Sequence, residues 1–413
     1  MGKMKSSVIS SYLVHPAILL FLLLLSQYSI EPASCASRVK FLPGFEGPLP
    51  FLLETGYVGV GESDDVQTFY YFIESNNNPK EDPLLLWLSG GHGCSSLTAL
   101  LLEIGPLAFK QEEYNGGAPN LILRNQSWNK VLDSLVSSGD DGGVSPPSSF
   151  RSGGDAKQRR CPANKSNKRR PNVSSIIYAD LPVKTGFSYA RTELAAQRSD
   201  KLFADQAHQF LRKWLIDHPN FLSSEVYIAG ASYSGIPLPA IVQEIVHANE
   251  EGIQPRINLQ GYLLGDPATT RREANYRIPF AYGMALISEE LYETYTSLLM
   301  TYWANDNNVQ TALNVRKGSI GTWIRCNQDE DFKFDIPSSV EYHANLSKKG
   351  YRSLIYNGDH DLLVPFLGTQ EWIRSLNYSI VDDWRPWNSN GQVAGYTRTY
   401  SNRMTFATVK ASI

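Results

Sequence analysis

Short apolar runs alternate with longer amphipathic stretches along most of this chain. Residues 84–88, 175–179 and 226–229 are runs of mainly branched and aromatic side chains, which are typical of buried strands. Between the last two runs, apolar residues recur every three or four positions, as on one face of a helix. They predict a helix over residues 200–216, and they are Leu202, Phe203, Ala207, Phe210, Leu211, Trp214 and Leu215.

Further segments continue the same alternation. Strand patterns recur at residues 257–264, 353–356 and 404–410, and a helical pattern covers residues 97–102. Strands that alternate with helices indicate an α/β fold with a mostly parallel central sheet and helices on both faces.

Residues 131–172 interrupt this alternation. They contain glycine, serine and proline clusters and two basic groups, at residues 157–160 and 168–170, with little apolar content. Such a composition predicts a disordered insertion. A basic processing or interaction loop is the functional alternative, but solvated charge runs without a role are more common.

The N-terminal segment has the pattern of a secretory signal peptide over residues 1–36. Lys3 and Lys5 precede an apolar run at residues 17–25, and small residues follow near residue 36. The run is too short to span a bilayer comfortably, so we expect a cleaved signal rather than a stable membrane anchor. The mature domain is then residues 37–413.

Glycosylation acceptor sequences support entry into the secretory pathway, with an extracellular or vacuolar destination. Five Asn-X-Ser sequences begin at Asn125, Asn164, Asn172, Asn345 and Asn377. We expect glycans at Asn125, Asn345 and Asn377.

Composition narrows the choice of partners only a little. The 413 residues are 42% hydrophobic and carry a formal net charge of −3, which gives no reason to expect nucleic acid or an anionic membrane. No metal or cofactor signature is evident. Because Cys35 lies at the cleavage region, at most one structural pair is expected among Cys94, Cys161 and Cys326.

Residues 226–245 have the pattern of a nucleophile elbow. A strand runs into Gly230-Ala-Ser232-Tyr233-Ser234, and a helical pattern follows. The turn is sharp enough that the positions two before and two after the nucleophile must be small, and here they are Gly230 and Ser234. The Ser232 hydroxyl would then stand clear of the sheet, with the Tyr233 backbone N–H facing a developing oxyanion.

Two other turns could complete a hydrolase site. Asp359 and Asp361 follow the strand at 353–356, and either carboxylate could orient a histidine. An Asp-rich turn that satisfies its own backbone is the ordinary alternative. Gly90 and Gly91 follow the strand at 84–88, where a backbone N–H could act as a second oxyanion donor.

Several motifs in the same order resemble the serine carboxypeptidase family, and closely its plant serine carboxypeptidase-like branch, which includes acyltransferases that use glucose esters. The similarity runs from Val39 to Lys410 apart from residues 131–172. The motifs begin at Trp87 (Trp-Leu-Ser-Gly-Gly-His-Gly-Cys-Ser), Glu103 (Glu-Ile-Gly-Pro), Asp180 (Asp-Leu-Pro-Val-Lys-Thr-Gly-Phe-Ser-Tyr), Gly230 (Gly-Ala-Ser-Tyr-Ser-Gly), Gly261 (Gly-Tyr-Leu-Leu-Gly) and Gly358 (Gly-Asp-His-Asp).

The resemblance implies an α/β-hydrolase fold and a set of roles. Ser232 corresponds to the nucleophile, Asp361 to the acid of the triad, and Gly91 and Tyr233 to the oxyanion donors. A disulfide between Cys94 and Cys326 is also implied. The residues that correspond to the family's network for a substrate carboxylate are Trp87, Ser89, Gly90, Glu103 and position 231.

The chain also departs from the family's pattern. The family's histidine follows the last strand in a Gly-Gly-His-like loop, whereas no histidine here lies beyond His360. His360 is a poor substitute, because it would have to reach Ser232 from the loop that should orient it.

Other differences concern the substrate site. Ala231 replaces an acidic residue, His92 a proline, and Lys184 a glycine. The cap region before Tyr302 is shorter than the family's, so we expect a shortened cap.

Two functions follow. The lineage favours a serine carboxypeptidase or acyltransferase that works through an acyl-serine intermediate, on a glucose ester or a peptide C-terminus. Ser89, residues 259–265 and residues 382–387 favour acyl transfer over peptide hydrolysis. The missing histidine favours the alternative, a catalytically inactive secreted pseudoenzyme or binding protein.

Overall fold

The structure is a computed structural model of the chain. It describes residues 36–110, 116–124, 127, 174–270, 299–327, 332–361, 363–389 and 391–410. Two compact units divide the chain, Met1–Cys35 and Ala36–Ile413, and all described residues belong to the second. The predicted insertion at 131–172 lies outside the described residues, as do residues 1–35 of the predicted signal peptide and residues 271–298 of the predicted short cap.

A twelve-stranded sheet dominates the described part of the chain. Its strands are β1 (Ser37–Val39), β2 (Leu53–Val60), β3 (Val66–Ile73), β4 (Leu84–Leu88), β7 (Ser175–Ala179), β8 (Tyr189–Ala190), β10 (Val226–Ala231), β11 (Leu259–Gly265), β13 (Arg352–Gly358), β14 (Ile380–Ser389), β15 (Gln392–Tyr400) and β16 (Met404–Val409). Two small sheets pair β5 (Leu107–Phe109) with β6 (Leu121–Leu123), and β9 (Arg198–Ser199) with β12 (Phe332–Lys333).

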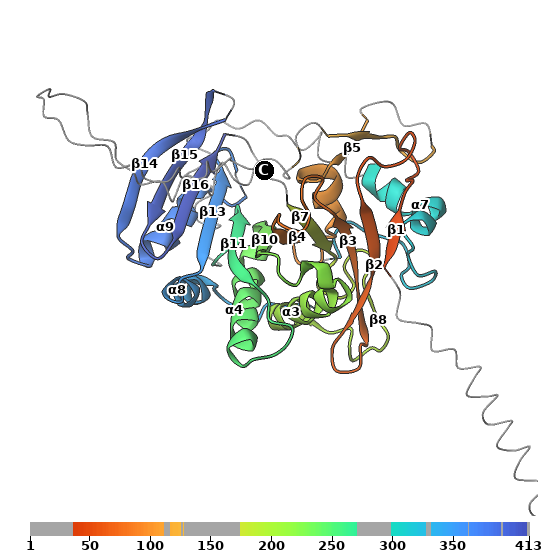
Figure 1. The fold of residues 1–413 in the computed structure, drawn as a ribbon, viewed down its shortest axis with the longest axis horizontal. Coiled ribbons are helices and arrows are strands. Elements are labelled where there is room, and N and C mark those ends of the chain that lie inside the picture. The colour runs from red at the N-terminus through yellow and green to blue at the C-terminus, as the bar shows by residue number, and fades with distance from the viewer. Residues whose placement is uncertain are drawn as a thin grey trace, which may run out of the picture. The chain divides into compact units, whose positions relative to one another are not determined.

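The sheet is parallel in its centre and antiparallel at both margins. Its order is β1-β2-β3-β7-β4-β10-β11-β13-β16-β15-β14, with β8 beside β3. The central strands from β7 to β16 run parallel, which confirms the predicted α/β fold. The outer strands are antiparallel, and they were not predicted from the sequence. Figure 1 shows β14 and β15 at one margin and β1 and β2 at the other.

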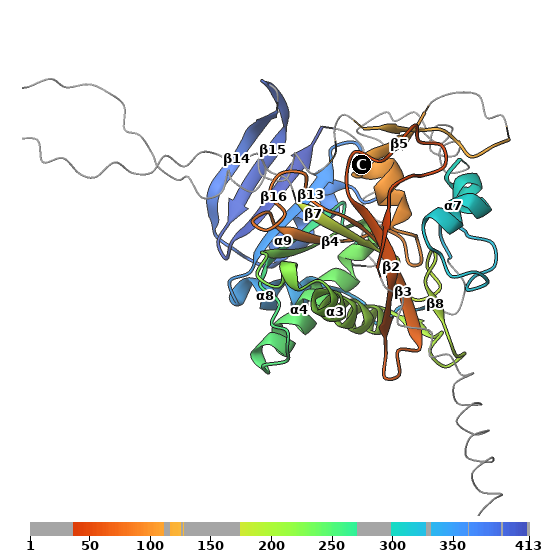
Figure 2. The same cartoon turned by 45° about the vertical axis from the view of Figure 1, so that its right-hand side comes forward.

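Helices cover both faces of the sheet. One buried cluster joins the sheet to α3 (Asp200–Asp217), α4 (Pro237–Glu250), α8 (Val340–Lys348) and α9 (Phe366–Ser375). A second cluster on the other face includes η1 (Ala99–Glu103), α7 (Asn307–Ala312) and the helical residues 299–304. The short turns η4 (Pro219–Phe221) and η5 (Ser232–Gly235) complete the described helical elements. Figure 2 shows α3 and α4 side by side on one face.

The helix predicted at residues 97–102 is present, but from Ala99 to Glu103 it is the π-helix η1. The N–H groups of Ile104 and Gly105 both donate to Ala99 O at 2.9 Å, and the Arg124 guanidinium bonds the carbonyls of Leu101 and Glu103. An outside cation therefore satisfies carbonyls that a longer helix would have bonded internally.

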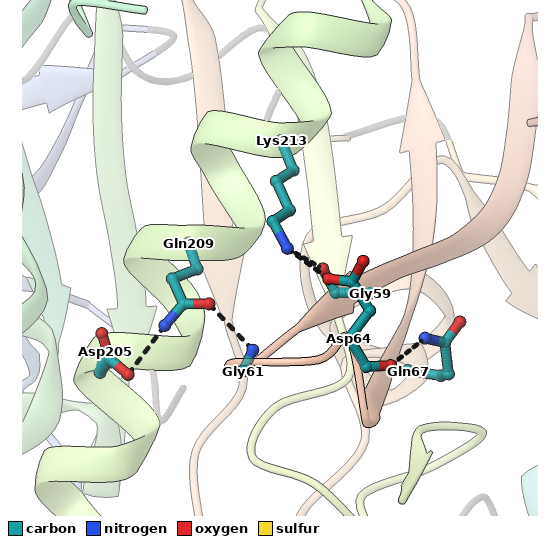
Figure 3. A network of polar contacts seen from close by, with 7 residues as sticks. All are labelled: Gly59, Gly61, Asp64, Gln67, Asp205, Gln209 and Lys213. Atoms are coloured by element: carbon teal, nitrogen blue, oxygen red, sulfur yellow. Dashed lines mark hydrogen bonds and ion pairs between the residues drawn. The ribbon is translucent and has the colours of Figure 1, made fainter. Parts of the chain in front are cut away.

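The amphipathic helix predicted at 200–216 is confirmed as α3, and its polar side anchors the β2–β3 hairpin (Figure 3). Gln209 Oε1 accepts a 2.9 Å hydrogen bond from Gly61 N–H. Lys213 Nζ donates to Gly59 O at 2.9 Å and forms an ion pair with Asp64. These contacts fix the hairpin turn on the helix, so the antiparallel margin is joined to the central layer.

A buried histidine of α8 lies between the sheet and α9. His343 is fully buried, its Nδ1 shares a 2.7 Å hydrogen bond with the Tyr262 hydroxyl, and its ring stacks on Trp372 at 4.5 Å. Its Nε2 has no hydrogen-bond partner among the described residues. Burial lowers the pKa of His343 to about 3, so the imidazole is neutral in the folded protein down to strongly acidic pH.

We expect the His343→Gln variant to be less sensitive to acid than the wild type. In the wild type the unfolded imidazole binds a proton below about pH 6.5 while the folded one does not, so stability falls as pH decreases. The contribution reaches about 2 kcal/mol at pH 5. Urea unfolding at pH 7.5 and 5.0 measures it, and the exposed His247→Gln is the matched control. An equal acid loss in all three proteins would contradict the prediction.

Candidate active site

The turn after β10 holds Ser232 in a strained backbone conformation. Ser232 has φ of +53°, a left-handed value that is uncommon for a residue other than glycine. A Cβ atom at position 230 would lie 2.7 Å from Leu88 O and 2.9 Å from Ser234 Cβ, so Gly230 cannot be larger. Ser234 Oγ donates to Ser89 O at 2.7 Å. The small residues that the sequence predicted around the turn are therefore required by its packing.

The glycine turn after β4 packs directly on Ser232. A Cβ atom at position 90 would lie 2.7 Å from Ser232 Cβ and 3.4 Å from its Oγ. Gly91 follows with φ of +74°, and Gly93 with φ of +86°. The structure thus brings the two predicted oxyanion segments, around Gly91 and around Tyr233, to the same serine.

A buried carboxylate holds the far end of this glycine turn. Asp180 accepts hydrogen bonds from the Ser95 hydroxyl at 2.7 Å, Ser96 N–H at 2.8 Å and Phe187 N–H at 3.1 Å. Burial raises its pKa to about 6, against the lowering effect of these bonds. Sequence reasoning placed Asp180 in a family motif but gave it no role, because its partners are distant in the chain.

The disulfide that the resemblance implied is present beside the same turn. Cys94 and Cys326 are bonded across a sequence separation of 232 residues. Backbone hydrogen bonds flank it, from Ser95 N–H to Arg325 O at 2.9 Å and from Asn327 N–H to Gly93 O at 2.8 Å. The glycine turn is therefore fixed on both of its sides.

Asp361 follows β13 at the same edge of the sheet. Because β10, β11 and β13 are adjacent and parallel, their carboxyl ends meet there. Asp361 Oδ1 accepts from Leu363 N–H at 2.6 Å and from Val364 N–H at 3.2 Å. The turn thus satisfies its own backbone, as the alternative interpretation expected, but one carboxyl oxygen carries both bonds.

The histidine of that loop faces the loop's other carboxylate. His360 Nδ1 lies 2.6 Å from Asp359 Oδ1, and its side chain is 51% exposed. Within the described ranges, no histidine side chain hydrogen-bonds Ser232 or Asp361. β16 ends beside the acid loop, since Asp359 N–H donates to Val409 O at 2.9 Å.

The residues expected to bind a substrate carboxylate lie on the η1 side of the sheet. Gly90 packs on Ser232, and the hydroxyl of the preceding Ser89 is buried with no hydrogen-bond partner among the described residues. Trp87 and Ala231 belong to one buried cluster there. Burial is the main cause of the raised pKa values of Tyr178 and Tyr356. Glu103, at the end of η1, is close enough for its charge to raise both further.

An aromatic cluster on the other side of Ser232 was not predicted. The His92 ring lies 5.4 Å from Tyr233, 5.1 Å from Phe332 and 4.9 Å from Phe334. Burial and the positive charge of Arg198 lower the pKa of His92, which favours its neutral form. The Phe-Lys-Phe alternation at 332–334 was the only local signal, and nothing in it indicated the site.

A cavity of about 330 Å³ adjoins this cluster. Six residues line it: Tyr233, Ile236, Ala268, Thr270, Phe334 and Ile336. The Tyr233 hydroxyl donates to Asp200, so the ring beside the nucleophile is held in place. Burial raises the pKa of Asp200, against the effect of this bond. A flat apolar group of a substrate fits such walls.

No group of three or more His, Cys, Asp or Glu residues in the described part of the chain is arranged to hold a metal ion. Similarly, none of the described helices combines the length and the hydropathy that crossing a bilayer requires.

The sequence profile of the serine carboxypeptidase family matches residues 43–136, 164–301 and 292–412. It leaves residues 137–163 unmatched, within the predicted insertion. Serine carboxypeptidase-like 2 of Arabidopsis thaliana is 46% identical over 99% of this chain and 94% of its own length. Serine carboxypeptidase-like 17 of the same plant is 47% identical over 92% of this chain and 90% of its own.

A solved structure has the same fold. The yeast prohormone-processing carboxypeptidase Kex1(Δ)p, from Saccharomyces cerevisiae, superposes with a TM-score of 0.68 at 18% identity and covers 90% of each chain. At that identity the match shows the α/β-hydrolase fold alone. The profile match and the relatives at 46–47% identity show more: this chain belongs to the serine carboxypeptidase family.

Proposed function

We propose that this protein transfers acyl groups through a covalent acyl-Ser232 intermediate, with Asp361 as the acid of the triad. The observation that carries the proposal is the strained turn at Ser232 with Gly90 packed against it. A buried serine on an ordinary helix or strand would need neither feature. Their combination exposes the hydroxyl beside a turn of backbone N–H groups.

The oxyanion donors in this proposal are the N–H groups of Gly91 and Tyr233. Both follow residues in contact, Gly90 and Ser232, so the two N–H groups can converge on one oxygen. Each donor of this kind contributes about 2.7–4 kcal/mol to lowering the barrier in hydrolases. Asp180 and the disulfide keep the first of them in place before substrate arrives.

The chemistry consists of two displacements. Ser232 Oγ attacks the carbonyl carbon of an ester and its proton passes to a base. The bond between that carbon and the sugar oxygen then breaks, and the oxygen leaves as a hydroxyl with the proton from the base. An acceptor hydroxyl attacks the acyl-serine and gives its proton to the base, which returns a proton to Ser232 Oγ as the acyl–serine bond breaks and the new ester leaves. Water as acceptor would give hydrolysis instead.

Transfer from a glucose ester is favoured over cleavage of a peptide C-terminus. Peptide recognition in this family uses an acidic residue at the position of Ala231, and Ala231 has no group to bind a carboxylate. The cavity of Tyr233, Phe334 and Ile336 suits an apolar, flat acyl group. We therefore infer a small-molecule acyl donor.

The secretory pathway is the proposed location. The disulfide is typical of an oxidising compartment, and two of the expected glycosylation residues, Asn345 and Asn377, are exposed. Asn125 lies outside the described residues.

A second candidate function is ligand binding without turnover. The observation that favours it is that no histidine side chain of the described residues hydrogen-bonds Ser232. In subtilisin, loss of the triad histidine costs about 10⁶ in kcat. The position from which the family's histidine would reach Ser232 is the edge beyond Val409, next to the acid loop.

Labelling with a fluorophosphonate probe separates the two functions. An activated serine reacts covalently, so we expect the folded, secreted protein to be labelled and Ser232→Ala to remain unlabelled, as read by intact mass. A folded wild type that binds an acyl-glucose but is not labelled would support the binding function and exclude the enzymatic one.

Gly90→Ala should slow labelling about 10²-fold without unfolding the protein. The new methyl group would press on Ser232 Cβ and displace the nucleophile from the oxyanion donors. Gly321→Ala is the matched control, because a Cβ there meets no atom within 4 Å. Equal labelling rates for both variants would show that the contact between Gly90 and Ser232 is not needed.

Phe334→Ala should weaken the use of aromatic acyl esters. Removing one wall of the cavity lowers kcat/KM for a cinnamoyl or benzoyl ester by about tenfold, while an acetyl ester, which is too small to reach that wall, is unaffected. Phe41→Ala, at an exposed position, is the control. A parallel loss for both esters would contradict a role in acyl selectivity.

A further inference from the structure

Asp266 is a buried carboxyl group at the active-site edge to which no role has been given so far. It follows β11, the strand between those that lead to Ser232 and to Asp361. Only 3% of it is exposed, and its φ of +40° lies in the left-handed region. Its N–H donates to Tyr356 O at 2.7 Å. A non-glycine residue held in this conformation indicates that the surroundings fix it.

One side of Asp266 faces the acid loop. Its Oδ1 accepts a 2.9 Å hydrogen bond from Gly358 N–H, at the end of β13. Burial raises the pKa of Asp266 to about 9, and the charge of the neighbouring Asp361 raises it as well, against the bonds from Gly358 and Asn357. The raised pKa favours the protonated form of Asp266. Its Oδ2 is buried and has no hydrogen-bond partner among the described residues, so this oxygen can carry a proton for the Asp361 carboxyl.

The other side of the same segment holds the nucleophile turn. Ala268 N–H donates to Ser232 O at 2.9 Å. A Cβ atom at position 235 would lie 2.3 Å from Ala268 O and 2.7 Å from Pro267 Cβ, so the segment packs closely on the turn. Residues 266–268 thus contact both the Ser232 turn and the Asp361 loop.

We propose that Asp266 is a positioning residue, which pairs its carboxyl group with that of Asp361 and so fixes the acid loop relative to the nucleophile turn. Carboxyl pairs that share a proton occur where two such groups are held close together. This inference rests on the proposed role of Asp361, but the pairing itself can be measured without any turnover.

The pairing has a definite effect on stability. Folded Asp266 keeps its proton up to a higher pH than unfolded Asp266, so its contribution to stability is complete below about pH 4 and is lost as pH rises toward 9. Besides Asp361, the titratable group that faces it is the phenol of Tyr356, and the charge of Glu103 acts on that phenol too.

The first experiment compares the unfolding of the wild type, Asp266→Asn, Asp361→Asn and the double variant between pH 5 and 9. As pH rises, the wild type should lose stability relative to Asp266→Asn. We expect the unfolding constant of the wild type, divided by that of the variant, to rise by up to tenfold per pH unit. With Asp361→Asn as the background, the rise should end at a lower pH, because the neighbouring charge is gone. An unchanged profile in that background would overturn the pairing.

A matched control is the buried Asp180, which does not contact the acid loop. The pH profile of Asp180→Asn relative to the wild type should be the same with and without Asp361→Asn. If Asp361→Asn moved the pH profile of Asp180→Asn as much as that of Asp266→Asn, its effect would be a general destabilisation of the fold. The pairing would then be rejected.

The second experiment tests positioning through the labelling rate of Ser232 per folded molecule. The amide of Asp266→Asn can still donate to Asp361, whereas Asp266→Ala cannot. We expect Asp266→Asn to be labelled at near the wild-type rate and Asp266→Ala at least tenfold more slowly. Equal labelling rates in both variants would show that Asp266 has a structural role only and does not position the acid loop. If the wild type is not labelled, the proposed function fails, and the unfolding cycle still decides the pairing.

Discussion

The contact between Gly90 and Ser232 is the constraint on which the rest of the site depends. A Cβ atom at position 90 would lie only 2.7 Å from Ser232 Cβ, so there is no space for a side chain there. Ser232 lies against the glycine turn in a left-handed conformation, and position 230 must be glycine because a Cβ atom there would lie 2.7 Å from Leu88 O. Strain of this kind costs about 1–3 kcal/mol and persists only where the surroundings hold it. Here the surroundings are a buried carboxylate, a disulfide and the parallel strands.

The parallel centre of the sheet explains how distant segments meet. Ser232, Asp266 and Asp361 each follow one of three neighbouring strands that point the same way, so short turns are enough to bring them together. The outer antiparallel strands contribute no site residue. They extend the sheet, and the hairpin of β2 and β3 is fixed on α3 by Lys213 and Gln209.

Sequence patterns predicted the centre of the fold and the nucleophile turn. The strands at 84–88 and 175–179, and the helix at 200–216, depend on local apolar spacing, which a pattern can detect. The outer strands were missed for two opposite reasons. β3 is buried at every position and shows no alternation, whereas β14 is mostly exposed and carries little apolar signal.

The residues that were missed act through contacts far apart in the chain. Asp180 bonds Ser95 across 85 positions, Phe334 reaches His92, and Asp266 meets Gly358 across 92 positions. No local pattern records such pairs. The proposed roles of Ser232 and Asp361 came from motifs, and the cavity beside Tyr233 needed the structure.

The central claim is that the strained turn aims Ser232 at a preformed oxyanion site. The most direct test is a crystal structure of the protein after reaction with a phosphonate ester. We expect the phosphorus on Ser232 Oγ and one phosphonyl oxygen within about 2.7–3.1 Å of the N–H groups of both Gly91 and Tyr233. An adduct on Ser232 whose oxygens bond neither N–H group would contradict the claim.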